Sequence, residues 1–153
     1  MTQQRISVES GNPTTRACFY YPLSVRFADT DCQGHVYFSN YLVYCDEALS
    51  AYLEAVGCGW RALRAQGLDF FFVDTGCQFK GRAYFEDQLH VHTKISRIGN
   101  SSFTGEMAVH RAVDGELIAT GFITCVMVDR ETGRPVPVPQ SFRDSVATYE
   151  VGS

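Results

Sequence analysis

Residues 26–41 read R-F-A-D-T-D-C-Q-G-H-V-Y-F-S-N-Y, and this stretch joins a strand-like run to the start of an amphipathic helix. Two carboxylates, Asp29 and Asp31, end the strand-like run, and a turn at Gly34 and the histidine His35 follow them. The unpaired N–H groups and the dipole at a helix N-terminus favour negative charge. The order of residues therefore predicts a carboxylate beside a helix N-terminus, where a carbonyl can be bound, polarised and attacked, either by the carboxylate or by water.

A stripe of apolar residues after this stretch predicts a helix over residues 37–56. Its members recur at spacings of three and four: Leu42, Cys45, Leu49, Tyr52, Leu53 and Val56. Ser39 or Asn40 is a candidate N-cap, and Gly57 suits the end of the helix. A short second helix is expected over residues 60–66.

Alternating apolar residues predict strands on both sides of the helix, over residues 17–27, 70–79, 89–98, 103–111 and 117–128. The Asp114-Gly115 pair is typical of a hairpin turn between the last two strands. The run P-V-P-V-P at residues 135–139 cannot supply a central strand, because proline has no N–H to donate.

This order of elements predicts an α+β fold, in which a curved antiparallel sheet of about five strands wraps around a long central helix. The length of 153 residues fits one domain. We expect a polar N-terminal tail over residues 1–16, the folded domain over residues 17–140, and a C-terminal tail over residues 141–153.

Composition excludes several classes of protein. The net charge of −4 lacks the basic excess that is typical of nucleic-acid binders. No apolar run approaches the roughly 20 residues of a membrane span, and the polar N-terminus does not resemble a signal peptide. The six cysteines contain no C-x-x-C pair, so we expect free thiols, no metal site and a cytoplasmic location.

The chain resembles a known family over residues 25–54. The pattern T-D-x-x-G-H-V-x-x-x-x-Y, at Thr30, Asp31, Gly34, His35, Val36 and Tyr41, resembles the active-site signature of hot-dog-fold acyl-CoA thioesterases. Within that superfamily the chain looks most similar to the 4-hydroxybenzoyl-CoA thioesterase branch, and the strand order extends the resemblance over most of its length. The resemblance implies a hot-dog fold and hydrolysis of an acyl or aroyl thioester to the free acid and coenzyme A.

The resemblance also implies roles for residues. Asp31 matches the catalytic carboxylate of the branch, and backbone N–H groups at Tyr37 and Phe38 are expected to polarise the thioester carbonyl. No cofactor is expected, because coenzyme A is part of the substrate. The branch works as a homodimer or homotetramer with sites at subunit interfaces, and we expect the same here.

The residues themselves leave alternatives open. Asp31 is either a nucleophile or a general base, and the competing interpretation is that it only caps the turn or the helix. For Asp29 we favour a solvated or turn-bonding role. His35 is placed in the site, with a positional role favoured over proton transfer, and Gly34 is expected to serve turn geometry. The resemblance adds that other hot-dog branches carry a catalytic carboxylate on this helix, which makes Glu47 a second candidate, although we favour a surface, turn-bonding or interface role for both Asp46 and Glu47.

The sequence departs from the branch where relatives hold the phosphates of coenzyme A. The turn between the third and fourth strands reads I-G-N-S-S at residues 98–102, with Arg97 as the cation beside it. We take Lys94, Arg97, Asn100 and Ser101 as candidate substrate-binding residues, with Lys80 and Arg82 as substitutes. Either coenzyme A is held differently, or the carrier is an acyl carrier protein. A hydratase or dehydratase, and a protein that binds acyl thioesters without turnover, are the alternative functions.

Overall fold

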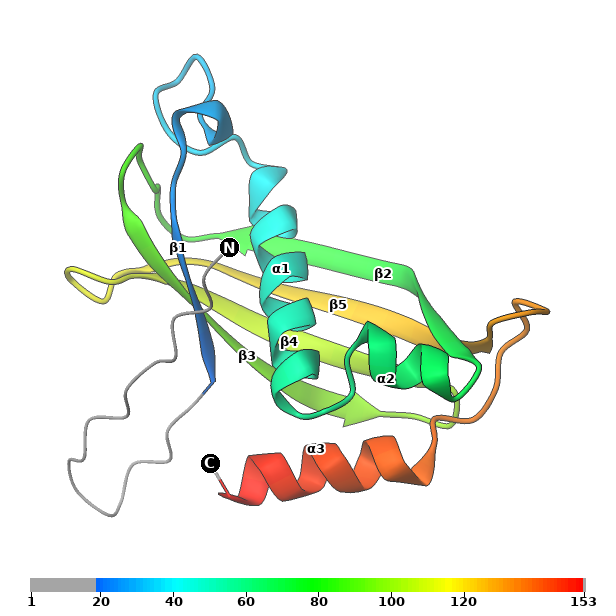
Figure 1. Cartoon of the computed structure of the whole chain (residues 1–153). Helices are drawn as coiled ribbons and strands as arrows, with labels where there is room; N and C mark the ends of the chain where they lie inside the picture. Colours follow the sequence, from blue (N-terminus) through cyan, green and yellow to red (C-terminus); the bar gives the residue numbers. More distant parts are fainter. Residues whose placement is uncertain (1–18, 153) are drawn as a thin grey trace.

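The computed structural model describes residues 19–152, in which three α-helices and five strands follow one another (Figure 1). In chain order the elements are β1 (Tyr20–Ser24), the 3-10 turn η1 (Phe27–Asp29), α1 (Asn40–Ala55), α2 (Trp60–Ala65), β2 (Leu68–Phe79), β3 (Gln88–Ile98), β4 (Ser102–Arg111), β5 (Leu117–Asp129) and α3 (Gln140–Gly152). The predicted tail over residues 1–16 lies outside the described residues.

The five strands form one antiparallel sheet in the order β1-β3-β4-β5-β2, and α1 lies across one face of it (Figure 1). Alternation along β4 explains which face α1 covers. Phe103, Gly105, Met107 and Val109 are buried toward the helix, whereas the residues between them are more exposed. The predicted α+β arrangement of about five strands around a long helix is therefore confirmed.

Two glycines set how closely α1 approaches the sheet. A Cβ atom at Gly105 of β4 would lie 2.9 Å from Cδ1 of Leu49, and one at Gly121 of β5 would lie 3.0 Å from Sγ of Cys45. Both distances are shorter than ordinary van der Waals contact. Any larger residue at these positions would push the helix away from the backbone of β4 and β5.

The helix begins three residues later than its apolar stripe predicts, at Asn40 rather than residue 37. The N–H of Tyr37 donates to the carbonyl of Asp29 at 2.9 Å, which ties Tyr37 to the preceding loop. Residues 38 and 39 then form a turn that leads into the helix. At the other end Gly57 takes a φ of +79°, a conformation that glycine adopts without strain and that commonly ends helices.

The prediction of a C-terminal tail over residues 141–153 is wrong for the described part. These residues form α3, which packs on the core through Phe142 and Val146, 1% and 5% exposed. The rings of Phe142 and Phe103 lie 4.9 Å apart between centroids, and the hydroxyl of Tyr52 on α1 donates to the carboxylate of Glu150. The apolar residues of α3 recur every three or four residues, which is a helical pattern. The prolines that precede it predicted a chain end instead.

Candidate active site

The stretch that precedes α1 is a tight loop that projects beyond the sheet (Figure 1). Thr30 and Val36 form an isolated antiparallel bridge, and inside it the N–H of Asp31 donates to the carbonyl of His35 at 3.0 Å. Gly34 closes the loop with a φ of +82°, as expected for a turn glycine, and its N–H donates to the carbonyl of Asp31 at 2.9 Å. The loop therefore presents residues 31–35 as one compact unit.

Asp31 is partly exposed, and only one of its oxygens is engaged. Oδ1 accepts the N–H of Gln33 at 2.8 Å, which is the turn-capping role that we weighed as the alternative to catalysis. Within residues 19–152 no donor contacts the other oxygen, Oδ2. Capping and chemistry are therefore compatible, because the turn fixes the carboxyl group and leaves one oxygen available.

The start of α1 offers fewer donors than the sequence suggested. We expected the N–H groups of Tyr37 and Phe38 to polarise a thioester carbonyl. The N–H of Tyr37 is already hydrogen-bonded to the carbonyl of Asp29 and is not available for this. The N–H of Phe38 donates to no acceptor in the described part of the chain. Ser39, the N-cap, makes no side-chain cap bond. Phe38 therefore presents a free N–H at the positive end of the helix dipole.

His35 makes a backbone hydrogen bond of the kind that the favoured positional role would use. Its Nδ1 lies 3.1 Å from the carbonyl oxygen of Val36. Because a carbonyl oxygen can only accept, Nδ1 must carry the proton of this bond. In the neutral ring Nε2 is then left as an acceptor, and the imidazole is held against the loop backbone.

We favoured a solvated or turn-bonding role for Asp29, and the structure shows the turn-bonding one, because the side chain is 3% exposed and accepts the N–H of Arg26 three residues earlier. Its carboxylate accepts hydrogen bonds from the guanidinium and the N–H of Arg26 and from the hydroxyl of Tyr44. Burial by itself would raise the pKa of the Asp29 carboxyl, but these hydrogen bonds outweigh it and lower the pKa. The sequence analysis missed Arg26 and Tyr44; the arginine three residues before the aspartate was the available signal.

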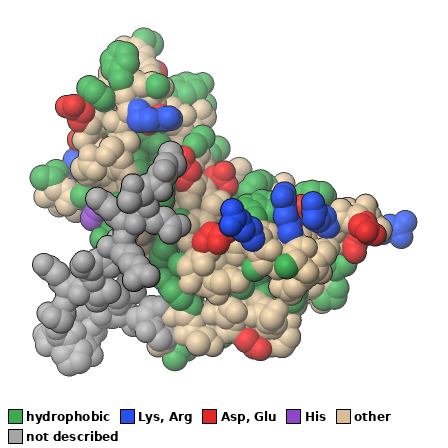
Figure 2. All heavy atoms as spheres, viewed as in Figure 1, with side chains coloured by type: hydrophobic (Ala, Val, Ile, Leu, Met, Phe, Trp, Pro, Cys, Tyr) green, Lys and Arg blue, Asp and Glu red, His purple; other side chains and the backbone are tan. Residues whose placement is uncertain are grey.

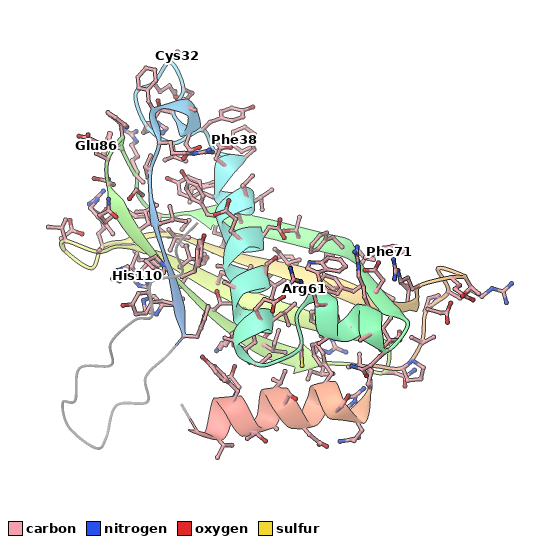
Figure 3. All side chains as sticks on the ribbon, in the orientation of Figure 1. Cys32, Phe38, Arg61, Phe71, Glu86 and His110 are labelled. Carbon is pink, nitrogen blue, oxygen red and sulfur yellow. The ribbon has the colours of Figure 1, made fainter. Side chains whose placement is uncertain are left out.

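Exposed aromatic side chains surround this end of the molecule, where Figure 2 shows hydrophobic groups gathered and Figure 3 labels Cys32 at the loop and Phe38 at the start of α1. They are Phe27, Tyr37, Phe38, Phe79, Tyr84 and Phe85. The ring of Phe38 contacts those of Tyr37 and Phe79, with centroids 4.9 and 6.3 Å apart. The free N–H and the carboxylate of the loop thus stand beside an apolar surface.

The candidate substrate-binding residues lie elsewhere. Lys94 pairs with Glu106 at 3.8 Å, and Arg97, Asn100 and Ser101 follow at the end of β3 and in the next turn. The start of β3 pairs with the end of β1 close to the Asp31 loop, and the strand then runs for about 30 Å away from it. One chain therefore does not bring these four residues to Asp31.

The helix carboxylates also point to other neighbours. Both Asp46 and Glu47 are exposed on α1. The carboxylate of Glu47 lies close to the hydroxyl of Tyr21 of β1, and burial together with this carboxylate raises the pKa of the Tyr21 hydroxyl. Glu47 is therefore engaged with β1 rather than with the Asp31 loop.

A groove of about 550 Å³ lies on the sheet face opposite α1. Its lining includes His92, Lys94, Glu106, Thr120 and Phe122, and no residue of the Asp31 loop takes part.

Among the described residues no group of three or more His, Cys, Asp or Glu side chains is arranged to hold a metal ion. Within residues 19–152 no helix has the length and apolar character needed to cross a membrane.

Known proteins resemble the chain in both sequence and structure. Residues 25–146 match the family described as the thioesterase-like superfamily. The chain is 30% identical to a 1,4-dihydroxy-2-naphthoyl-CoA hydrolase of Thermosynechococcus vestitus, over 78% of this chain and 83% of the relative. It is 26% identical to the putative acyl-CoA thioesterase YneP of Bacillus subtilis, over 84% and 92%. The solved structure of a gentisyl-coenzyme A thioesterase is 30% identical, with a TM-score of 0.73 over 84% of this chain and 99% of that one.

Proposed function

The chain belongs to the thioesterase-like superfamily, and from this premise we propose that it hydrolyses acyl-CoA thioesters to the free acid and the thiol of coenzyme A. Its sheet around α1 is the hot-dog fold that the sequence resemblance implied. Relatives named for hydrolysis of aroyl-CoA and acyl-CoA thioesters support the same reaction for this chain. The proposed chemistry needs water and a carboxylate, and no cofactor.

One observation carries the proposal: where the loop enters α1, a carboxylate oxygen of Asp31 and the N–H of Phe38 both lack a partner among residues 19–152. The thioester carbonyl oxygen would accept the Phe38 N–H, and the negative charge that develops on it would be stabilised by that bond and by the helix dipole. Asp31 would act on the carbonyl carbon in one of two ways, which the geometry leaves open.

In the first route the Asp31 carboxylate attacks the carbonyl carbon, the thiolate of coenzyme A leaves, and water cleaves the resulting mixed anhydride. In the second route Asp31 takes a proton from a water molecule, which attacks the carbonyl directly and expels the same thiolate. Either route consumes one water and yields one carboxylic acid and one thiol. His35, held by Val36, would shape the loop in both routes.

Replacing Asp31 by Asn tests the proposal directly. We expect kcat for thiol release from a panel of acyl-CoAs to fall by about 10²-fold to 10⁴-fold, because both routes require the carboxylate. Asp144→Asn, the same change on the exposed surface of α3, is the matched control. A folded Asp31→Asn protein with near wild-type hydrolysis would remove Asp31 from the mechanism, and tight acyl-CoA binding without thiol release would favour a binding protein.

We further propose that the enzyme is a homo-oligomer built on the free edge of β2. Edge strands of soluble proteins are usually short or interrupted, as β1 is by Pro22. In contrast, β2 has 12 residues without lysine or proline, no strand pairs with its outer side in the described sheet, and Phe71, Phe72, Val73 and Phe79 are about half exposed. A second copy that pairs antiparallel with β2 would cover this edge.

Such a pairing would place the start of one β2 beside the end of the other, where Phe79 contacts Phe38. Four arginines belong to segments next to the start of β2, namely Arg61 and Arg64 on α2 and Arg130 and Arg134 in the turn after β5. Figure 2 shows basic side chains on this part of the surface. None of the four forms an ion pair within residues 19–152. They would supply cations for phosphates bound at the partner's site. That coenzyme A rather than an acyl carrier protein carries the acyl group stays a prediction, and so does a cytoplasmic location.

A further inference from the structure

Two hydrogen bonds to a single carbonyl tie the start of α1 to the residue two positions before Asp31. The carbonyl oxygen of Asp29 accepts the N–H of Tyr37 at 2.9 Å and the side-chain amide Nδ2 of Asn40 at 2.9 Å. Asn40 is the first residue of α1, so its side chain reaches from the helix back to the segment that carries Asp31.

The carboxylate of Asp29 is fixed as firmly as its carbonyl. Oδ1 accepts Nη2 of Arg26 at 2.7 Å, and Oδ2 accepts the backbone N–H of Arg26 at 3.0 Å and the hydroxyl of Tyr44 at 2.9 Å. Tyr44 lies one helical turn after Asn40 and is buried. Helix α1 therefore donates side-chain hydrogen bonds to Asp29 at two places, to its carbonyl from Asn40 and to its carboxylate from Tyr44.

From this geometry we propose that Asn40 is a positioning residue for the proposed hydrolysis, and the inference rests on that proposed function. Its amide holds the Asp29 carbonyl against the first turn of α1, which sets the carboxylate of Asp31 relative to the N–H of Phe38. The same carbonyl accepts the N–H of Tyr37, so that within residues 19–152 the N–H groups of Phe38 and Ser39 are the ones left without an acceptor at the start of α1. Asn40 acts through Asp29 and does not itself contact the thioester.

The chemistry explains why this alignment matters. An oxyanion donor works only within about 2.7–3.1 Å of the oxygen that becomes charged. A displacement of about 1 Å in a catalytic arrangement can lower the rate by about 10²-fold. Loss of the Asn40 bond would misalign Asp31 and Phe38 without removing any group that binds the rest of the substrate. The effect is therefore expected in kcat rather than in KM.

Replacing Asn40 by Asp separates positioning from stability. Asp has the size of Asn and is favourable in the first turn of a helix, but a carboxylate cannot donate to the Asp29 carbonyl. We expect kcat to fall by about tenfold to a hundredfold, with KM changed by less than about twofold and the unfolding temperature retained. Asn40→Ala removes the donor without adding charge, and its kcat is expected to fall as well.

The chain offers a matched control for the change from amide to carboxylate. Nε2 of Gln140 donates to Oδ1 of Asp144 at 2.9 Å on the exposed surface of α3. Gln140→Glu therefore removes the same kind of donor away from the loop and from the arginines near β2, and kcat and KM are expected to stay at wild-type values. A second readout is amide hydrogen exchange at Tyr37, which is expected to be slow in the wild type and faster in Asn40→Asp.

The outcomes distinguish the two proposals. A wild-type protein that releases no thiol from any acyl-CoA overturns the proposed function and the role of Asn40 with it. An active wild type whose folded Asn40→Asp and Asn40→Ala variants keep kcat within about twofold overturns the role of Asn40 alone. An amide hydrogen exchange rate at Tyr37 that is the same in Asn40→Asp as in the wild type would also overturn the role of Asn40.

Discussion

Two aspartates that stand two residues apart on the chain have opposite surroundings. Asp29 is 3% exposed, and its carboxylate accepts hydrogen bonds from Arg26 and Tyr44. Asp31 is partly exposed, and its carboxylate accepts one N–H from the loop. A buried and fully bonded carboxylate is a poor nucleophile or base, because its lone pairs are occupied and its charge is neutralised. These surroundings give Asp29 a structural role and support the proposal that Asp31 carries the chemistry.

The buried carboxylate makes stability depend on pH. Since the hydrogen bonds lower the pKa of Asp29 below its ordinary value of 3.8, its stabilisation is complete above that value and is lost as the pH falls through the lowered one. We expect Asp29→Asn to reduce the free energy of unfolding by about 1–3 kcal/mol at pH 7. The difference from wild type should shrink below about pH 4, which urea unfolding at several pH values measures. A difference that grows on acidification would contradict this account.

At the scale of elements, period-two alternation was a reliable guide to the strands, and the helical stripe was a reliable guide to α1. The boundaries were less well predicted, because the start of α1 is decided by a bond between Tyr37 and Asp29 that no local pattern reveals. The end of the chain was the main error. Proline-rich residues 135–139 look like the boundary of a tail, yet α3 follows them and is anchored by Phe142.

Phe142 tests whether α3 is part of the folded domain. Its ring is 1% exposed and packs against Phe103. We expect Phe142→Ala to lower the free energy of unfolding by about 3–5 kcal/mol, because a large buried side chain is replaced by a cavity. Chemical unfolding measures the change, with Ser141→Ala on the exposed side of the same helix as the control, expected within about 0.5 kcal/mol of wild type. A tail outside the domain would show no loss for either variant.

At the scale of the whole molecule, the free edge of β2 and the aromatic surface near Asp31 point to the same conclusion. Both leave several large apolar side chains about half exposed next to one another, and Phe79, at the end of β2, belongs to each. A single chain thus leaves the proposed site open on the side of β2. An antiparallel second copy would close it, and the arginines near the start of β2 would then approach the partner's loop.

Val73 is the residue to change, since it is 57% exposed and stands at the bulge of β2. We expect Val73→Lys to lower the mass measured by light scattering to that of one chain, because a lysine on an edge strand opposes pairing. Hydrolysis of acyl-CoA should fall with it. Val113→Lys, at an 86% exposed position between β4 and β5, should change neither property. A monomeric wild type, or Val73→Lys with unchanged mass, would rule out this interface.

The sequence by itself determined the class of fold and the family, and it supplied the prediction that Asp31 carries the chemistry. These follow from local patterns: the alternation of strands, the stripe of a helix, and a short motif around Asp31. Tertiary structure decided which N–H of the helix start stays free, that Asp29 is buried rather than solvated, that α3 joins the core, and that the predicted phosphate-binding residues lie far from Asp31 in the same chain. Each of these depends on contacts between different segments of the chain. Such contacts produce no periodic pattern or fixed spacing in the sequence from which they could be predicted.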